Sequence, residues 1–190
     1  AQVTECHAAE CQRAFETLVV RRSAREPLAY ITGLREFWNL LIEVTPAVLV
    51  PRPETELLIE AALEQFDRTQ AVRILDVCTG SGCVTVGLGR ELPRATLVAS
   101  DISEEALDVA RRNVARHGLS ARTQCVCADL LTGIPGPFDL IVANPPYVAE
   151  GDPHLAALGH EPRSALVSGP GGLDALCGIV RAAPRHLEAG

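Results

Sequence analysis

The chain has 190 residues, of which 47% are hydrophobic and 22% charged, a composition typical of a soluble globular protein with one core. Its 17 basic and 24 acidic residues give a net charge of −7, which disfavours a protein that grips nucleic acid mainly through phosphates. No apolar run is long enough to span a bilayer and no signal peptide is visible. Seven cysteines then indicate free thiols in a reducing compartment, so we expect a cytoplasmic protein with no membrane partner.

The first part of the chain predicts a helix followed by short strands. Residues 8–25 have a helical pattern of apolar positions, and a Glu-Pro pair ends that pattern. The next stretch mixes aromatic and β-branched residues with glycine, asparagine and proline, which predicts a hairpin around Trp38–Val50 with Trp38 in its core. A helix is then expected from Pro53 to about Phe66, because proline and acidic residues favour the first turn of a helix.

From residue 71 onward, expected strands alternate with expected helices. The strands are 71–77, 95–101, 122–130 and 138–144, and the helices are 83–92, 103–118 and one within 171–190. Ser103 is expected to cap the second of these helices. Gly87 and Gly89 in the first are best explained by close packing of helix on sheet. This alternation predicts an α/β fold with a doubly wound, mostly parallel sheet.

Polar residues follow each of the four expected strands. They are Asp76–Gly82, Asp101, Asp129 and Asn144–Tyr147. The carboxyl ends of parallel strands meet at one edge of the sheet, where such folds bind their ligands. Any single aspartate there is about as often a turn former or a cap as a ligand. Four such strand ends together favour a binding site.

The residue types at this edge suit a nucleoside with no pyrophosphate. Gly80 and Gly82 let the backbone approach a ligand, but the dinucleotide fingerprint needs a small residue where this chain has Thr85, which weakens an NAD site. An acid at Asp101 suits the two hydroxyls of a ribose. Asp129 suits the amino group of adenine. Adenine and ribose together point towards S-adenosylmethionine (SAM).

The sequence Asn144-Pro145-Pro146-Tyr147 forms a stiff loop directly after the last strand, because each proline fixes its own backbone and restricts the residue before it. The simplest interpretation is a turn. The functional one is a cradle for a planar NH2 group, in which the Asn144 side-chain carbonyl and the Pro145 backbone carbonyl each accept one N–H. Tyr147 would then supply a stacking face or a wall. A sulfonium is already a good electrophile, so positioning supplies most of the catalysis and no strong base is needed.

These motifs resemble those of known enzymes. Asp76 to Gly82, Asp101 and Asn144 to Tyr147 resemble the motifs of Rossmann-like class I SAM-dependent methyltransferases that act on amino groups. Three further blocks are similar to the release-factor glutamine methyltransferases, the PrmC/HemK family. They read EPLAYITGLREFW, VTPAVLVPRPETELLIE and HEPRSALVSGPGGLD, and together they cover most of residues 26–175.

The resemblance implies an enzyme that methylates the glutamine of the Gly-Gly-Gln loop in class I peptide-chain release factors, with SAM as cofactor. It implies that the cofactor is bound by Cys78, Thr79, Gly80, Ser81, Gly82, Asp101, Asp129, Leu130 and Asn144. It implies that the acceptor is bound by Asn144, Pro145, Pro146 and Tyr147, with Asn144, Pro145 and Tyr147 catalytic. The chain departs from the family at Cys78, where a glycine is usual, and at Leu130, where many members have an aromatic residue.

The expected domain organisation has three parts. Residues 1–29 are expected to be a remnant of a helical substrate-recognition domain, 30–52 a hairpin linker and 53–190 the methyltransferase domain. The chain starts at Ala1 and stops at Gly190, so we expect it to be truncated at both ends. We further expect that a strand is missing beside 138–144, which leaves an exposed sheet edge.

Two other functions remain open at this point. An adenine-N6 nucleic-acid methyltransferase shares the Asn-Pro-Pro-Tyr motif, but the negative charge and the lack of a basic recognition segment disfavour direct nucleic-acid binding. A non-catalytic subunit with a SAM fold is disfavoured by the intact Asn144 loop and Asp101.

Several other polar residues are given simpler interpretations. No metal site is expected, because Cys125 and Cys127 have no second pair nearby. His117, His154 and His160 are expected at the surface. For Arg52 and Glu54, a local ion pair and a loop closing over cofactor and substrate are equally favoured.

Overall fold

A four-stranded parallel sheet forms the centre of the computed structural model, which describes residues 2–188 and the side chains from residue 10 onward. Its spatial order is β5 (Thr123–Cys127), β4 (Thr96–Asp101), β3 (Arg73–Val77) and β6 (Leu140–Ala143). Every neighbouring pair is parallel. The predicted doubly wound α/β fold is therefore confirmed, and each predicted strand corresponds to an observed one.

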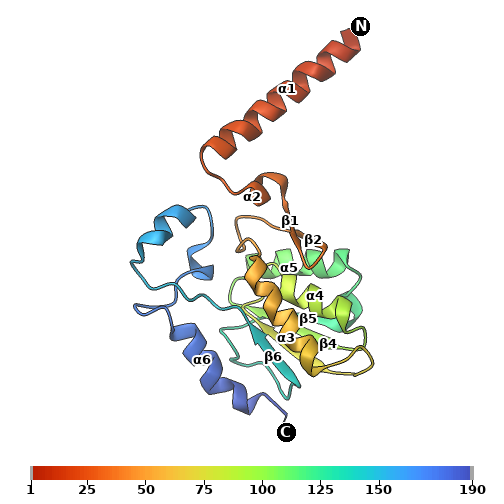
Figure 1. Cartoon of the computed structure of the whole chain (residues 1–190), viewed down its shortest axis with the longest axis vertical. Helices are drawn as coiled ribbons and strands as arrows, with labels where there is room; N and C mark the ends of the chain where they lie inside the picture. The colour runs from red at the N-terminus through yellow and green to blue at the C-terminus, as the bar shows by residue number, and fades with distance from the viewer. Residues whose placement is uncertain (1, 189–190) are drawn as a thin grey trace.

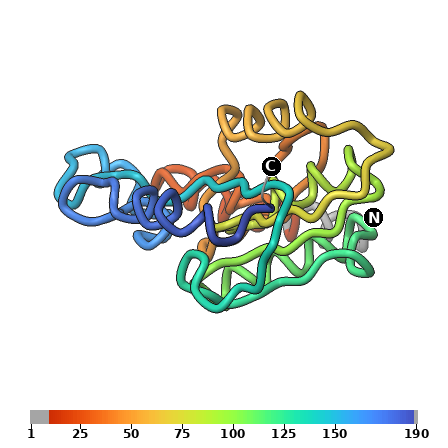
Figure 2. The backbone as a smooth tube through the Cα atoms, turned by 90° about the horizontal axis from the view of Figure 1, so that it is seen from below, coloured from red at the N-terminus to blue at the C-terminus, as the bar shows by residue number. Residues whose placement is uncertain are grey.

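Three helices cover one face of this sheet: α3 (Leu57–Gln65), α4 (Cys83–Glu91) and α5 (Glu104–Arg116) (Figures 1 and 2). α5 begins where predicted, because the Ser103 side chain accepts a hydrogen bond from the Ala106 backbone N–H at 3.2 Å. α4 is buried along almost its whole length. A Cβ on Gly87 would collide with Ile59, and one on Gly89 would lie 2.8 Å from Leu119. The close packing expected at these two glycines is confirmed.

The other face of the sheet is covered by the loop 128–138 and by α6 (Asp174–Ala182), followed by η5 (Ala183–Arg185). Phe138 and Ile179 are buried there against Leu75 and Val77. The last two residues of the region where a helix was expected, 189–190, lie outside the described residues.

The residues after η5 make one contact with the sheet beside Phe138. The Phe138 N–H donates to the His186 carbonyl at 2.7 Å, and the Glu188 N–H donates to the Phe138 carbonyl at 2.9 Å. This forms a parallel bridge between Phe138 and Leu187. The turn after α6 brings 186–188 to Phe138, but this isolated bridge is not a strand, and β6 is an edge strand of the described sheet, as expected. Beyond the bridge, no described residue pairs with the outer edge of β6.

The segment before the sheet differs from the prediction. The hairpin consists of β1 (Leu34–Phe37) and β2 (Leu40–Glu43), so its predicted position around Trp38–Val50 was wrong. Trp38 and Asn39 form the two-residue turn with φ of 52° and 54°, a left-handed geometry that matches the twist of the strands. Trp38 therefore does not lie in the hairpin core but packs half-buried against the main core, with its Nε1–H donating to Glu91 Oε1 at 3.1 Å.

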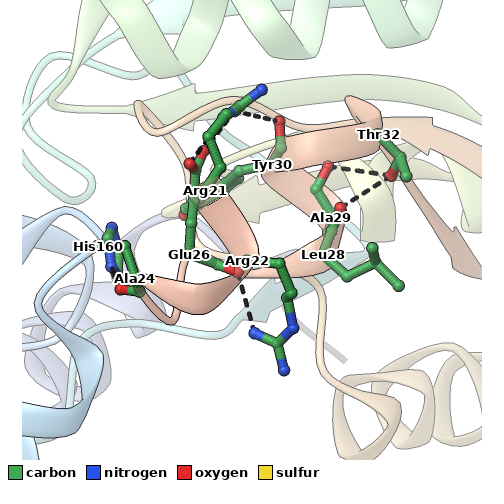
Figure 3. Close-up of polar contacts among 9 residues, drawn as sticks. All are labelled: Arg21, Arg22, Ala24, Glu26, Leu28, Ala29, Tyr30, Thr32 and His160. Atoms are coloured by element: carbon green, nitrogen blue, oxygen red, sulfur yellow. Dashed lines mark hydrogen bonds and ion pairs between the residues drawn. The ribbon is translucent and has the colours of Figure 1, made fainter. Parts of the chain in front are cut away.

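Two helices precede the hairpin. α1 (Gln2–Ser23) points away from the rest of the molecule (Figure 1), and its apolar residues Phe15 and Val20 are exposed. α2 (Leu28–Thr32) is a single turn where short strands had been expected. At the junction of the two helices, the Arg21 guanidinium contacts the Glu26 carboxylate at 2.5 Å, and the Ala24 carbonyl lies 3.0 Å from His160 Nε2 (Figure 3).

His160 belongs to the long connection between β6 and α6. This connection contains the short helices η3 (Pro153–Leu158) and η4 (Arg163–Ala165) and extends away from the sheet (Figure 2). The exposed His160 ring is thus not merely solvated, as had been expected, but ties this connection to the α1–α2 junction.

Candidate functional site

A cavity of about 480 Å³ lies at the carboxyl ends of the strands. All four predicted strand ends contribute to its lining, which includes Asp76 and Cys78–Ser81, Asp101, Asp129 and Leu130, and Asn144 and Pro146. The parallel sheet thus brings together residues from four separate segments of the chain. Gly82, Pro145 and Tyr147, also predicted as site residues, are not among the residues that line the cavity.

The loop between β3 and α4 is shaped by three residues with left-handed backbone: Cys78 (φ 59°), Gly80 (φ 54°) and Gly82 (φ 76°). A Cβ at Gly82 would lie 3.1 Å from Ala110 Cβ, so this glycine permits close approach to α5. Cys78 adopts a geometry that costs about 1 kcal/mol for a residue with a side chain. Burial raises the pKa of its thiol to about 12, so Cys78 contributes a neutral, unreactive wall.

Asp76 is the buried anchor of this loop. Its Oδ2 accepts hydrogen bonds from Thr79 Oγ1 at 2.6 Å, Thr85 Oγ1 at 2.6 Å and the Thr85 N–H at 3.1 Å. Burial nevertheless raises the pKa of Asp76 to about 6. Thr85 stands where a dinucleotide site needs a small residue. Its two hydrogen bonds to the buried Asp76 carboxylate give it a structural role instead.

Asp101 ties the end of β4 to the same loop. Its Oδ2 accepts from the Gly80 N–H at 2.9 Å and its Oδ1 from the Ser103 N–H at 3.0 Å. Each carboxylate oxygen has a second lone pair, so both retain capacity to accept from a ligand. The carboxylate is thus held in a fixed orientation at the cavity wall. Asp129 is exposed at the rim, and Leu130 beside it has a φ of 50°.

The loop after β6 presents Asn144 to the cavity. The Asn144 Nδ2–H donates to Thr55 Oγ1 at 3.3 Å. Pro145 is buried, whereas Tyr147 is 61% exposed. The chain then pairs with a distant segment, because the Val148 N–H donates to the Leu166 carbonyl at 2.8 Å and the Ser168 N–H to the Val148 carbonyl at 3.0 Å.

Two parts of the cavity lining come from outside the sheet, and none of their residues is among the predicted site residues. One is the segment 44–56, which ends in η1 (Pro53–Glu56), and the other is the segment 161–168. The Arg52 guanidinium contacts the Glu161 carboxylate at 2.5 Å, and the Val50 N–H donates to the same carboxylate at 3.1 Å. Glu161 is buried, so this ion pair locks the two walls together. The partner of Arg52 thus lies 109 residues away, so the local ion pair considered from the sequence was wrong, while Glu54 is exposed.

The cavity is acidic. Four aspartates contribute to its lining, and none of the described residues that line it is basic. They are Asp76, Asp101, Asp129 and Asp174. A site for a phosphate-bearing cofactor would be expected to offer a positive charge or several free backbone N–H groups. These residues fit instead a cationic ligand with hydroxyl and amino groups, which is the chemistry of SAM.

Among the described residues, no group of three or more His, Cys, Asp and Glu side chains is arranged to hold a metal ion. Within the same part of the chain, no helix has the length and apolar character needed to cross a membrane.

Comparison with known proteins first defines the class. The family model of the methyltransferase small domain matches residues 53–166. The Thermus thermophilus 16S rRNA N2 G1207 methyltransferase (RsmC), solved with AdoMet and guanosine, has a TM-score of 0.63 at 21% identity over 83% of this chain and 39% of that one. The catalytic domain of hMettl16 has a TM-score of 0.62 at 21% identity, over 83% of this chain and 61% of that one. The fold is that of the class I SAM-dependent methyltransferases.

Closer relatives define the family. The release factor glutamine methyltransferase of Xylella fastidiosa (strain Temecula1) is 44% identical over 187 residues, which is 96% of this chain and 67% of that protein. That of Bordetella pertussis (strain Tohama I) is 44% identical over 183 residues, 94% of this chain and 67% of that protein. The model of the PrmC N-terminal domain matches residues 5–33. The chain therefore belongs to the release factor glutamine methyltransferase family, which confirms the resemblance found in its motifs.

Burial of Asp76 predicts a specific pH dependence of stability. A carboxyl group whose pKa is raised to about 6 in the folded state binds its proton more tightly there than in the unfolded chain. The free energy of unfolding should therefore fall as the pH rises from about 4 to about 6, by about 3 kcal/mol from this group. Asp76→Asn keeps an acceptor oxygen for both threonines but removes this titration.

Urea denaturation of the parent and of Asp76→Asn at a series of pH values measures this effect. The other titrating groups are common to both proteins, so the difference between the two curves isolates Asp76. A difference that stays constant from pH 4 to pH 7 would contradict the prediction.

Proposed function

We propose that this chain uses SAM to methylate the N5 nitrogen of the glutamine in the Gly-Gly-Gln loop of a class I peptide-chain release factor. The observation that carries the proposal is that Asp101 and Asn144 line one cavity. One of these residues suits the cofactor and the other suits a planar amide. The relatives named above as release factor glutamine methyltransferases supply the substrate class.

The residues proposed to hold SAM come from the ends of three strands and the loop after β3. Residues 78–82 would follow the cofactor with their backbone, and Asp101 would accept from the ribose hydroxyls. Asp129 would accept from the adenine amino group, and Leu130 would cover the adenine with an aliphatic side chain. When bound, SAM supplies a methyl group on a positively charged sulfur, which is an electrophile.

The acceptor amide would be held by the loop after β6. The Asn144 side-chain carbonyl and the Pro145 backbone carbonyl would each accept one N–H of the glutamine amide, and this aims the nitrogen towards the methyl group. Pro146 lines the cavity beside them, and the exposed Tyr147 would form a wall at its rim. Catalysis by positioning fits the acidic cavity, in which no basic side chain is needed.

The proposed division of labour follows the expected domains. Residues 1–29 would contact the release factor, residues 30–52 would link the parts and residues 53–190 would bind SAM and transfer the methyl group. A protein substrate of translation places the reaction in the cytoplasm, with neither a membrane nor nucleic acid as a direct partner.

A methylation assay with two acceptors offered in parallel tests the function. We expect transfer of labelled methyl from SAM to a class I release factor, and no transfer to adenine-containing DNA or RNA. A release factor whose Gly-Gly-Gln glutamine is replaced by alanine serves as the control and should accept nothing. Labelling of the nucleic acid alone would overturn the proposal in favour of the adenine methyltransferase.

Asp101→Ala should weaken SAM binding by well over tenfold. The loss of a charged hydrogen-bond acceptor costs about 1.5–3 kcal/mol, and a tenfold change in affinity corresponds to about 1.4 kcal/mol. Isothermal titration with SAM measures the effect. Asp108→Ala, which removes an exposed aspartate from the outer side of α5, is the matched control and should bind SAM as the parent does. Parental affinity in Asp101→Ala would show that the cofactor is held elsewhere.

Asn144→Ala should leave SAM binding within about twofold of the parent but lower the rate of methyl transfer by about 100-fold or more, because one of two acceptors for the glutamine amide is lost. Single-turnover transfer to the release factor, with a separate titration of SAM, measures both quantities. Transfer close to the parental rate would mean that the Asn-Pro-Pro-Tyr loop is only a turn.

A further inference from the structure

The partner of the Asn144 side chain lies 89 residues earlier in the chain. The Asn144 Nδ2–H donates to Thr55 Oγ1 at 3.3 Å, and both residues line the cavity. Thr55 is 8% exposed, so its hydroxyl is largely shielded from bulk water. The contact joins the loop after β6 to a segment that does not belong to the sheet.

In this contact the Nδ2 end of the Asn144 amide faces Thr55, whose hydroxyl oxygen accepts. An asparagine side chain carries a donor NH2 and an acceptor oxygen that differ little in size, so packing alone selects poorly between its two orientations. With Nδ2 directed at Thr55, the carbonyl oxygen Oδ1 lies on the opposite side of the amide. In the reversed orientation, Asn144 would present an NH2 group to the NH2 group of an incoming amide, and neither could accept.

Thr55 is itself held firmly. Its backbone N–H donates to the Arg52 carbonyl at 3.0 Å, which begins η1. Arg52 is anchored by the buried Glu161, and the next residue of η1, Glu56, accepts from the Trp38 N–H at 2.8 Å through its Oε1. The Thr55 hydroxyl therefore comes from a segment that is held on both sides of Thr55, by Glu161 at Arg52 and by the Trp38 N–H at Glu56.

We propose that Thr55 is a positioning residue for methyl transfer: by accepting a hydrogen bond from Asn144 Nδ2, it keeps Asn144 Oδ1 directed at the acceptor amide. The proposal deepens the function stated above and rests on it for the identity of the acceptor. It assigns Thr55 no contact with the glutamine. Its effect is transmitted through the orientation of Asn144.

The test compares two substitutions at one position. Thr55→Val keeps the shape of the side chain but removes the oxygen, and it should lower the kcat of release-factor methylation about tenfold with little change in the Kd for SAM. Thr55→Ser restores the oxygen and should recover most of that loss. Thr123→Val is the matched control, because the Thr123 hydroxyl is buried with no hydrogen-bond partner among the described residues and lies at the opposite end of the sheet.

The outcomes separate this proposal from a purely structural role. A kcat of Thr55→Val close to that of the parent would overturn it, and so would equal losses in Thr55→Val and Thr55→Ser. A loss of SAM affinity that matches the loss of kcat would show that Thr55 is only part of the pocket wall. If the valine variant does not fold, Thr55→Ala compared with Thr55→Ser answers the same question.

A spectroscopic readout makes the test independent of the substrate. The side-chain NH2 signals of Asn144, identified by their absence from the spectrum of Asn144→Ala, should shift in Thr55→Val and stay in place in Thr123→Val. Unchanged signals in Thr55→Val would overturn the positioning role even in an active enzyme. Inactivity of the parent towards the release factor, with the shift present, would instead refute the proposed function alone.

Discussion

The common register of the parallel strands is the constraint on which the site depends. Val77 at the end of β3 lies opposite Ser100 of β4 and Ala143 of β6, and Asp101 lies opposite Cys127 of β5. Four chain segments therefore end at one level, and the residue that follows each strand enters the same space. The central strands β3 and β4 are buried along most of their length, so a change of register would disrupt their packing against both neighbouring layers.

The strand ends form only part of the cavity lining. The segments 44–56 and 161–168 form another part, and the ion pair between Arg52 and Glu161 holds these two segments together. A buried carboxylate is costly unless it is paired and hydrogen-bonded, and Glu161 meets both conditions only when Arg52 and the Val50 N–H are in place. The segments 44–56 and 161–168 are therefore stable in this arrangement together. Through η1 the same interaction fixes the neighbourhood of Asn144, which links the packing of two loops to the geometry of the acceptor site.

The electrostatics of the cavity match chemistry by positioning. The lining carries aspartates and no described basic side chain, so it favours a positively charged ligand over a phosphate. Cys78 stays neutral because burial raises its pKa, and Asp76 is engaged by Thr79 and Thr85. The carbonyl oxygens of Asn144 and Pro145 are then the groups proposed to bind the acceptor amide. Such groups can align an amide nitrogen, which needs alignment more than deprotonation.

The sequence by itself determined the features that depend on local chemistry: the alternation of strands and helices, the cap at Ser103, the packing at Gly87 and Gly89, and the four strand ends that line the cavity. These follow from periodicity, turn preferences and the rule that parallel strands end at one edge. Only the tertiary structure decided the position of the hairpin, the contact of Arg52 with Glu161 across 109 residues and that of Asn144 with Thr55 across 89. Such contacts leave no periodic trace in the sequence, because they join loops whose paths are set by the packing of the whole chain. The bridge between Leu187 and Phe138 depends on tertiary structure for the same reason, because the turn after α6 returns the chain to the sheet.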